Sequence, residues 1–290
     1  MTDSSPSSTY HRHELAKDAA EVHAFHESNR QGWNEGAIRY TEWLEKSIAK
    51  INARQSSLHP IERANLRRPG IDPLLGWCSL AIHLQCASGE DTLSLWLEGA
   101  SRVIGVDISD VHIENARKLT AATQAPAEWY RCDLLDTPHA LDGTADLVYT
   151  GQGALCWIHD LDAWAGVVAR LLKPGGVFHV LDDHPMSWMF EQDADTLRYA
   201  EGMSYFNYAE AAQGWPTTYI GDLGKKPEEL SVMYERLWPL ASIHAALTGA
   251  GLRVDYLGEH PDDYWNSYPN LKPEYRGLIP MTFSMRAIKA

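Results

Sequence analysis

Short apolar runs alternate with amphipathic stretches between residues 79 and 186 of the 290-residue chain. The apolar runs have the length of strands, and the stretches between them repeat their apolar residues at helical spacing. This alternation is typical of a parallel sheet that is covered by helices on both faces. The expected strands are 79–85, 102–108, 127–133, 145–152 and 177–183, and the expected helices are 91–100, 109–124 and 160–172.

Helical and strand patterns return near the C-terminus. Residues 240–252 read as a helix, and the runs 253–261 and 280–290 read as strands that could pair antiparallel at the sheet edge. Residues 186–238 lack the strand–helix rhythm and are dense in aromatic residues. Aromatic walls suit a flat or cationic substrate, although most of these rings would simply pack the segment itself.

The N-terminal part has a different pattern. Residues 14–55 read as helical, with a break expected near Gly32 or Gly36, and the proline-rich residues 56–73 read as a linker. The first fifteen residues lack the apolar centre of a signal peptide, so we expect a disordered tail and a cytoplasmic protein. The predicted division is a tail and helical lid at 1–75 and a main domain at 76–290 with an insertion at 186–238.

The amino-acid composition makes some kinds of binding partner unfavourable. The formal charge of −14 disfavours a nucleic-acid substrate, because phosphate contacts need clustered Lys and Arg. No apolar run is long enough to span a bilayer, which predicts no membrane partner. The four cysteines have no CxxC spacing, and the N-terminal histidines have no cluster that would close a metal site. No metal is therefore expected.

In an open parallel sheet, ligands bind beyond the carboxyl ends of the strands. Asp107 ends the second strand, 18 residues after Gly89, where a carboxylate can accept both hydroxyls of a ribose. Asp133 ends the third strand and could accept from an exocyclic amine, or it could be a turn residue. The turn 85–89 lacks the glycines that a pyrophosphate needs. An adenosine with an uncharged sulfur linkage needs less clearance than a dinucleotide.

These segments resemble class I S-adenosylmethionine-dependent methyltransferases of a bacterial small-molecule subgroup. The matching stretches are "AIHLQCASGEDTLSLWLEGASRVIGVDIS", "YRCDLLD", "ADLVYTGQGALCW" and "VVARLLKPGGVFHVLDDHP". The resemblance implies an α/β Rossmann-like seven-stranded sheet with an antiparallel edge strand and helices on both faces. It also implies a cofactor, S-adenosyl-L-methionine. The residues that it assigns to the cofactor are Gln85, Cys86, Ala87, Gly89, Asp107, Ile108, Asp133, Leu134, Thr150 and Gly151, with Trp33 closing the site.

Methyl transfer is an in-line displacement, and a base is needed only if the nucleophile must lose a proton. His184, after the fifth strand, is the first candidate base, although a structural role in its His-Pro turn is equally open. His159 is the second candidate, and Asp183 could orient a base or bind an amine.

The predicted acceptor is an O or N atom of a small molecule. The motif [DNS]-P-P-[YF], with which enzymes of this kind methylate the exocyclic amines of bases, does not follow the fourth strand. The alternatives are an NAD(P)-dependent oxidoreductase on a similar sheet and a non-catalytic cofactor-binding protein.

Overall fold

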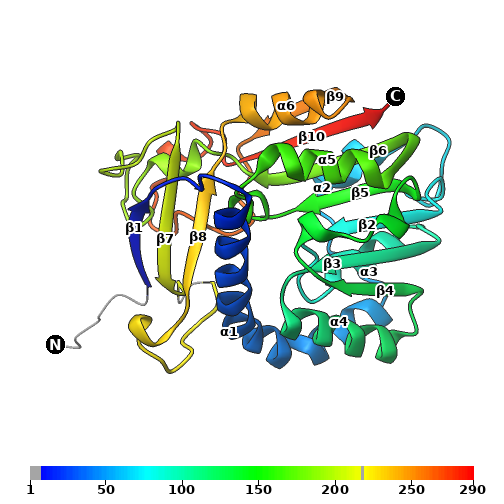
Figure 1. The fold of residues 1–290 in the computed structure, drawn as a ribbon, viewed down its shortest axis with the longest axis horizontal. Coiled ribbons are helices and arrows are strands. Elements are labelled where there is room, and N and C mark those ends of the chain that lie inside the picture. The colour runs from blue at the N-terminus through cyan, green and yellow to red at the C-terminus, as the bar shows by residue number, and fades with distance from the viewer. Residues whose placement is uncertain (1–7, 217–218) are drawn as a thin grey trace.

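A seven-stranded sheet forms the centre of the computed structural model, which describes residues 8–216 and 219–290. Its strands are β2 (Leu80–Leu84), β3 (Arg102–Asp107), β4 (Ala127–Arg131), β5 (Ala145–Gly151), β6 (Leu172–Asp183), β9 (Leu252–His260) and β10 (Thr282–Lys289). They lie in the order β4-β3-β2-β5-β6-β10-β9, and β10 runs antiparallel to both neighbours (Figure 1). The expected Rossmann-like sheet with a reversed edge is confirmed, with β9 outermost.

Helices cover both faces of this sheet. Leucines of α3 (Glu90–Leu97) and α4 (Asp110–Thr123) pack into one hydrophobic cluster, and α5 (Leu161–Leu171) and α6 (Leu240–Gly249) pack into the other. Ser109 and Asp160 cap α4 and α5 by accepting from backbone N–H groups in the first turns, as their sequence positions predict. Both faces are therefore buried at the centre of the sheet, which is why β2, β3 and β5 read as apolar runs.

A second, three-stranded antiparallel sheet contains β1 (Ser8–His13), β7 (Tyr208–Gly214) and β8 (Val232–Leu237), in the order β1-β7-β8. The prediction of a disordered N-terminus is therefore wrong for residues 8–13, whereas residues 1–7 lie outside the described part. The error has a physical cause: β1 is held by hydrogen bonds to a strand that begins about 200 residues later in the chain. No local pattern reports such a pairing.

The expected break in the N-terminal helix is also wrong. Helix α1 (Ala19–Asn52) is continuous and stands between the two sheets in Figure 1. A Cβ at Gly32 would lie 2.4 Å from Cγ of Met233, and one at Gly36 would lie 2.9 Å from the ring of Trp215. These glycines allow the helix to approach the insertion closely, so their role is packing and not a turn. The short helix α2 (Pro60–Leu66) follows within the segment expected to be a linker.

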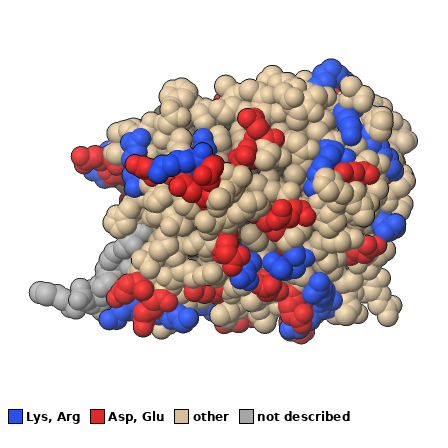
Figure 2. Space-filling view, in the orientation of Figure 1, with Lys and Arg blue, Asp and Glu red and all other residues tan. Residues whose placement is uncertain are grey.

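The parallel strands point toward α1 and the small sheet (Figure 1). On the face shown in Figure 2, acidic and basic side chains are interspersed rather than gathered by sign. Within the described residues, no helix combines the length and the apolar character needed to cross a membrane. The region between the sheet edge and the small sheet is thus where a ligand site is expected.

Candidate functional site

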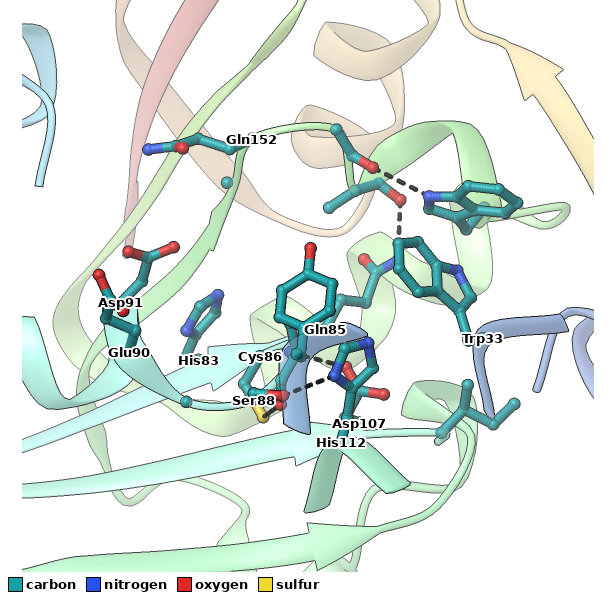
Figure 3. Close-up of a pocket in the computed structure, with 18 of the residues that line it drawn as sticks. Trp33, His83, Gln85, Cys86, Ser88, Glu90, Asp91, Asp107, His112 and Gln152 are labelled. Carbon is teal, nitrogen blue, oxygen red and sulfur yellow. Dashed lines mark hydrogen bonds between the residues drawn. The ribbon is translucent and has the colours of Figure 1, made fainter. Parts of the chain in front are cut away.

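A cavity of about 640 Å³ lies at the carboxyl ends of β2, β3 and β5, where an open parallel sheet binds ligands. Its floor is the loop 85–91, and α1 contributes Trp33 and Tyr40 to its wall. In Figure 3 the labelled residues of the loop run from Asp91 and Glu90 at the left to Cys86 and Ser88 at the lower centre, and Trp33 lies at the right. The predicted closure of the site by the N-terminal helix is consistent with this arrangement.

Asp107 ties the loop after β2 to the end of β3. One carboxylate oxygen accepts from the N–H of Ala87 at 2.8 Å, and the other accepts from the N–H of Ser109 at 2.9 Å. Burial raises the pKa of Asp107 to about 6, although these N–H groups stabilise its charged form. The loop itself is bent: Gln85, Ala87 and Gly89 have φ of 59°, 45° and 88°. Asp107 therefore shapes the loop and also lines the cavity.

Asp133 lies at another end of the cavity and is held by α1. Nδ1 of His26 lies 2.7 Å from one oxygen of Asp133, and the N–H of Leu135 donates to the other at 3.0 Å. Burial opposes ionisation here, but the hydrogen bonds from His26 and Leu135, together with the charges of His26 and His23, outweigh it, and the pKa of Asp133 is lowered. Asp133 is thus a fixed acceptor, and its partner His26 was not expected from the sequence.

Three buried polar atoms on the cavity wall have no hydrogen-bond partner among the described residues. They are Nε2 of His83, Oε1 of Gln85 and Nε2 of His112. The other ring nitrogens are engaged, since Nδ1 of His83 lies 2.9 Å from Thr92 Oγ1 and Nδ1 of His112 lies 2.8 Å from Ser88 Oγ. Burial lowers the pKa of both histidines to about 3, so both rings are neutral near pH 7. Native proteins seldom leave such atoms unpaired, and a polar ligand would supply the missing partners.

Charged groups of both signs gather near His83. Nζ of Lys50 lies 2.8 Å from Glu90, and both side chains line the cavity together with Asp91. Figure 3 shows Glu90 and Asp91 beside His83, with Gln152 above them. A wall that carries positive and negative charges fits a zwitterionic amino-acid group. The region of Asp107 and Asp133 fits a nucleoside. The cavity therefore fits S-adenosyl-L-methionine on the chemistry of its donors and acceptors.

Most residues that the sequence assigned to a cofactor do line this cavity. The set is Trp33, Gln85, Cys86, Ala87, Gly89, Asp107, Ile108, Asp133, Leu134 and Gly151. Thr150 is the exception: it is fully buried and does not line the cavity. Side chains alternate along a strand, so a residue next to the strand end can point into the core instead.

Neither of the two candidate histidine bases lies on the cavity wall. Nδ1 of His184 accepts from the N–H of Met186 at 3.0 Å, and its Nε2 lies 2.9 Å from Glu259. Nε2 of His159 lies 3.0 Å from the carbonyl oxygen of Tyr234. The contacts of His184 favour the structural alternative for the His-Pro turn, because they leave no ring nitrogen directed at the cavity.

Asp183 is different, because it adjoins the cavity. A Cβ built on Gly153 would lie 3.6 Å from Oδ2 of Asp183 and 3.5 Å from Nε1 of Trp265. Gly153 and Trp265 both line the cavity. Asp183 therefore adjoins the cavity, although its side chain is not part of the cavity wall.

Comparison with known proteins agrees with this geometry. Residues 81–176 match a family described as a methyltransferase domain. Over this segment the chain has a class I S-adenosylmethionine-dependent methyltransferase domain. This match favours a methyltransferase over a nicotinamide-dependent oxidoreductase on a similar sheet. No curated protein matches the methyltransferase in sequence.

Solved structures show the same fold. A methyltransferase from Mesorhizobium loti is 22% identical, with 72% of this chain and 90% of that chain covered and a TM-score of 0.50. A putative methyltransferase from Listeria monocytogenes is 19% identical, with 73% and 91% covered and a TM-score of 0.53. Geranyl diphosphate C-methyltransferase from Streptomyces coelicolor A3(2) is 15% identical, with 82% and 79% covered and a TM-score of 0.52. At these identities the similarity concerns the fold of the methyltransferase and not its acceptor.

Proposed function

We propose that this methyltransferase transfers a methyl group from S-adenosyl-L-methionine to an O or N atom of a small molecule. The observation that carries the proposal is the continuity of one cavity, from the nucleoside-like end at Asp107 and Asp133 to an aromatic end at Trp157, Tyr219 and Trp265. Its volume of about 640 Å³ lies within the range of pockets for small ligands, roughly 300–1,000 Å³.

Each residue expected to bind the cofactor has a role at the cofactor end of the cavity. Asp107 would accept from the ribose hydroxyls, and Asp133 with Leu134 would frame the adenine. The loop 85–89 and Gly151 would hold the methionyl part, with His83 and Asp91 next to its charged groups. Trp33 would cover the ligand from α1. When bound, the cofactor supplies an electrophilic methyl group on a sulfonium centre.

The aromatic end supports a small acceptor. Tyr219 and Trp265 have ring centroids 5.1 Å apart, and Trp33 and Trp157 have centroids 5.3 Å apart. Such rings exclude water and orient a small organic molecule, which is the main requirement of an in-line displacement. The net charge of −14 adds to this, because it disfavours nucleic acid as the acceptor.

The test is a binding experiment with Asp107→Asn. The substitution keeps the size of the side chain and removes its charge, so S-adenosylhomocysteine should bind with about 2 kcal/mol less free energy, or roughly thirtyfold more weakly. Asp110→Asn is the matched control, because Asp110 is half exposed and does not line the cavity. Titration calorimetry measures both variants, and thermal unfolding confirms that they are folded.

Two results would contradict the proposal. One is an unchanged affinity in folded Asp107→Asn. The other is a wild-type protein whose melting temperature rises with NAD⁺ and not with S-adenosylhomocysteine, since a ligand stabilises the folded state that binds it.

A further inference from the structure

Asp183 adjoins the aromatic end of the cavity through Gly153, and further acidic side chains act on it. Asp183 ends β6, and Glu235 lies on β8 of the small sheet. Glu210 on β7 is the direct cross-strand partner of Glu235, so their side chains share a face. The charges of Asp183 and Glu210 both act on Glu235, which brings carboxylates from two sheets into one region.

The ionisable side chains of this group are all acidic. Burial first, and then the charge of Asp182, raises the pKa of Asp183 well above its usual range. Burial first, and then Glu210 and Asp183, raises the pKa of Glu235 to about 8. The Arg236 guanidinium is committed elsewhere, because it stacks 3.6 Å from the ring centroid of Trp238 and donates to the carbonyl of His159. A cation placed among these carboxylates would relieve their repulsion.

A buried hydroxyl group beside Asp183 points to a missing ligand. Thr282 is the in-register neighbour of Asp183 on β10, so the two side chains lie on the same face of the sheet. Thr282 is only 1% exposed, and its Oγ1 has no hydrogen-bond partner within the described parts of the chain. The hydroxyl of Tyr264 is buried beside the Asp183 carboxyl group and interacts with it. Buried polar atoms without partners are exceptions in native proteins.

Aromatic rings complete this wall. The ring centroid of Trp265 lies 5.1 Å from that of Tyr264 and 5.1 Å from that of Tyr219. Carboxylates together with the faces of tryptophan and tyrosine rings are the combination that binds organic cations.

We propose that the methyl acceptor is a small organic amine, whose nitrogen is held by Asp183 and Glu235 against the rings of Trp265 and Tyr219. The inference rests on the proposed function, because it names the class of acceptor for the same cavity. Asp183 is the contact to the cavity, through Gly153, and Glu235 supplies the second carboxylate.

The proposed methyl transfer needs only the amine, the cofactor and the carboxyl group of Asp183. An ammonium group cannot attack, so Asp183 first accepts one of its protons and becomes a neutral carboxyl group. The nitrogen lone pair then forms a bond to the methyl carbon, and the sulfur keeps the electron pair of the bond that breaks. The products are the methylated ammonium ion and S-adenosylhomocysteine, and the proton on Asp183 leaves to solvent.

The experiment measures the binding of matched amines and alcohols to the protein saturated with S-adenosylhomocysteine. The probes are 2-phenylethylamine against 2-phenylethanol and hexylamine against hexanol. In at least one pair the amine should bind tenfold or more tightly than its alcohol. Asp183→Asn and Glu235→Gln should each remove that preference and leave the affinity for S-adenosylhomocysteine within threefold. Glu201→Gln, an exposed glutamate of the same insertion, is the matched control and should retain it.

Proton release provides a second measurement on the wild-type protein, which needs no variant to fold. Because the carboxyl pKa values are raised, binding of an ammonium group near neutral pH should release up to one proton, and binding of an alcohol should release none. Calorimetry in buffers of different ionisation enthalpy counts these protons. The titratable groups that face Asp183 and Glu235 are Asp182, Glu210, Asp263, Tyr264 and Cys156.

The outcomes separate the two proposals. Equal binding of amines and alcohols in both pairs, or an amine preference that survives Asp183→Asn, would overturn the inference while S-adenosylhomocysteine still binds. Failure of S-adenosylhomocysteine to bind the wild-type protein would instead overturn the proposed function.

Discussion

The buried carboxyl group of Glu62 provides a direct test of how burial next to the end of β5 affects stability. This carboxyl group on α2 is fully buried, where it accepts from the hydroxyl of Tyr149 and from the N–H of His59. It lies next to Gly151, since a Cβ built there would be 3.3 Å from Oε1 of Glu62. Burial raises the pKa of Glu62 from 4.5 to about 7, although both hydrogen bonds favour its charged form.

A raised carboxyl pKa means that the folded protein binds this proton more tightly than the unfolded chain. The stability that Glu62 contributes is fully present below pH 4.5 and is lost as the pH rises through about 7. The difference between 4.5 and 7, at about 1.4 kcal/mol per pH unit, gives a total loss of about 3 kcal/mol. Glu62→Gln keeps the shape of the side chain and does not titrate, so the variant should not lose this stability.

Urea unfolding of the wild type and of Glu62→Gln at several pH values measures the effect. The free energy of unfolding of the variant, minus that of the wild type, should rise by about 2.5 kcal/mol between about pH 5 and pH 8. Contributions from the other titratable groups cancel in this difference. Glu228→Gln, at an exposed glutamate, should show no such change. Two parallel pH profiles for Glu62→Gln and the wild type would refute the reasoning.

Two further predictions concern the loop and the turn. Ala87→Gly should leave stability within about 1 kcal/mol and should not weaken binding of S-adenosylhomocysteine, because the positive φ of 45° strains an alanine and not a glycine; a tenfold weaker affinity by calorimetry would show that the methyl group has another role. His184→Asn should lower stability by about 1–3 kcal/mol, since the contacts to Glu259 and Met186 are lost. Turnover per folded molecule should stay within threefold of the wild type, and a hundredfold loss with intact cofactor binding would restore His184 as a base.

The central sheet could be predicted because its signals are local. The inner parallel strands β2, β3 and β5 are short apolar runs bounded by turn residues, and Ser109 and Asp160 mark helix starts by their own side chains. Since the carboxyl ends of parallel strands meet at one edge, Asp107 and Asp133 could be placed at a common site from their strand positions alone. The sequence by itself therefore determined the sheet, and most of the candidate cofactor residues that it named do line the cavity.

Only the tertiary structure decided what depends on contacts between distant segments. The strand at residues 8–13 exists because β7 pairs with it, and a glycine stands at position 36 of the continuous helix α1 because the ring of Trp215 leaves no room for a Cβ there. His184 and Asp183 are adjacent in sequence, yet the histidine is bound to Glu259 while the aspartate adjoins the cavity. Periodicity reports which face of an element is buried, but not which partner covers it. Asp183 therefore replaces His184 as the candidate base. Successive residues point in opposite directions, and the surrounding elements determine which of the two lies nearer the ligand.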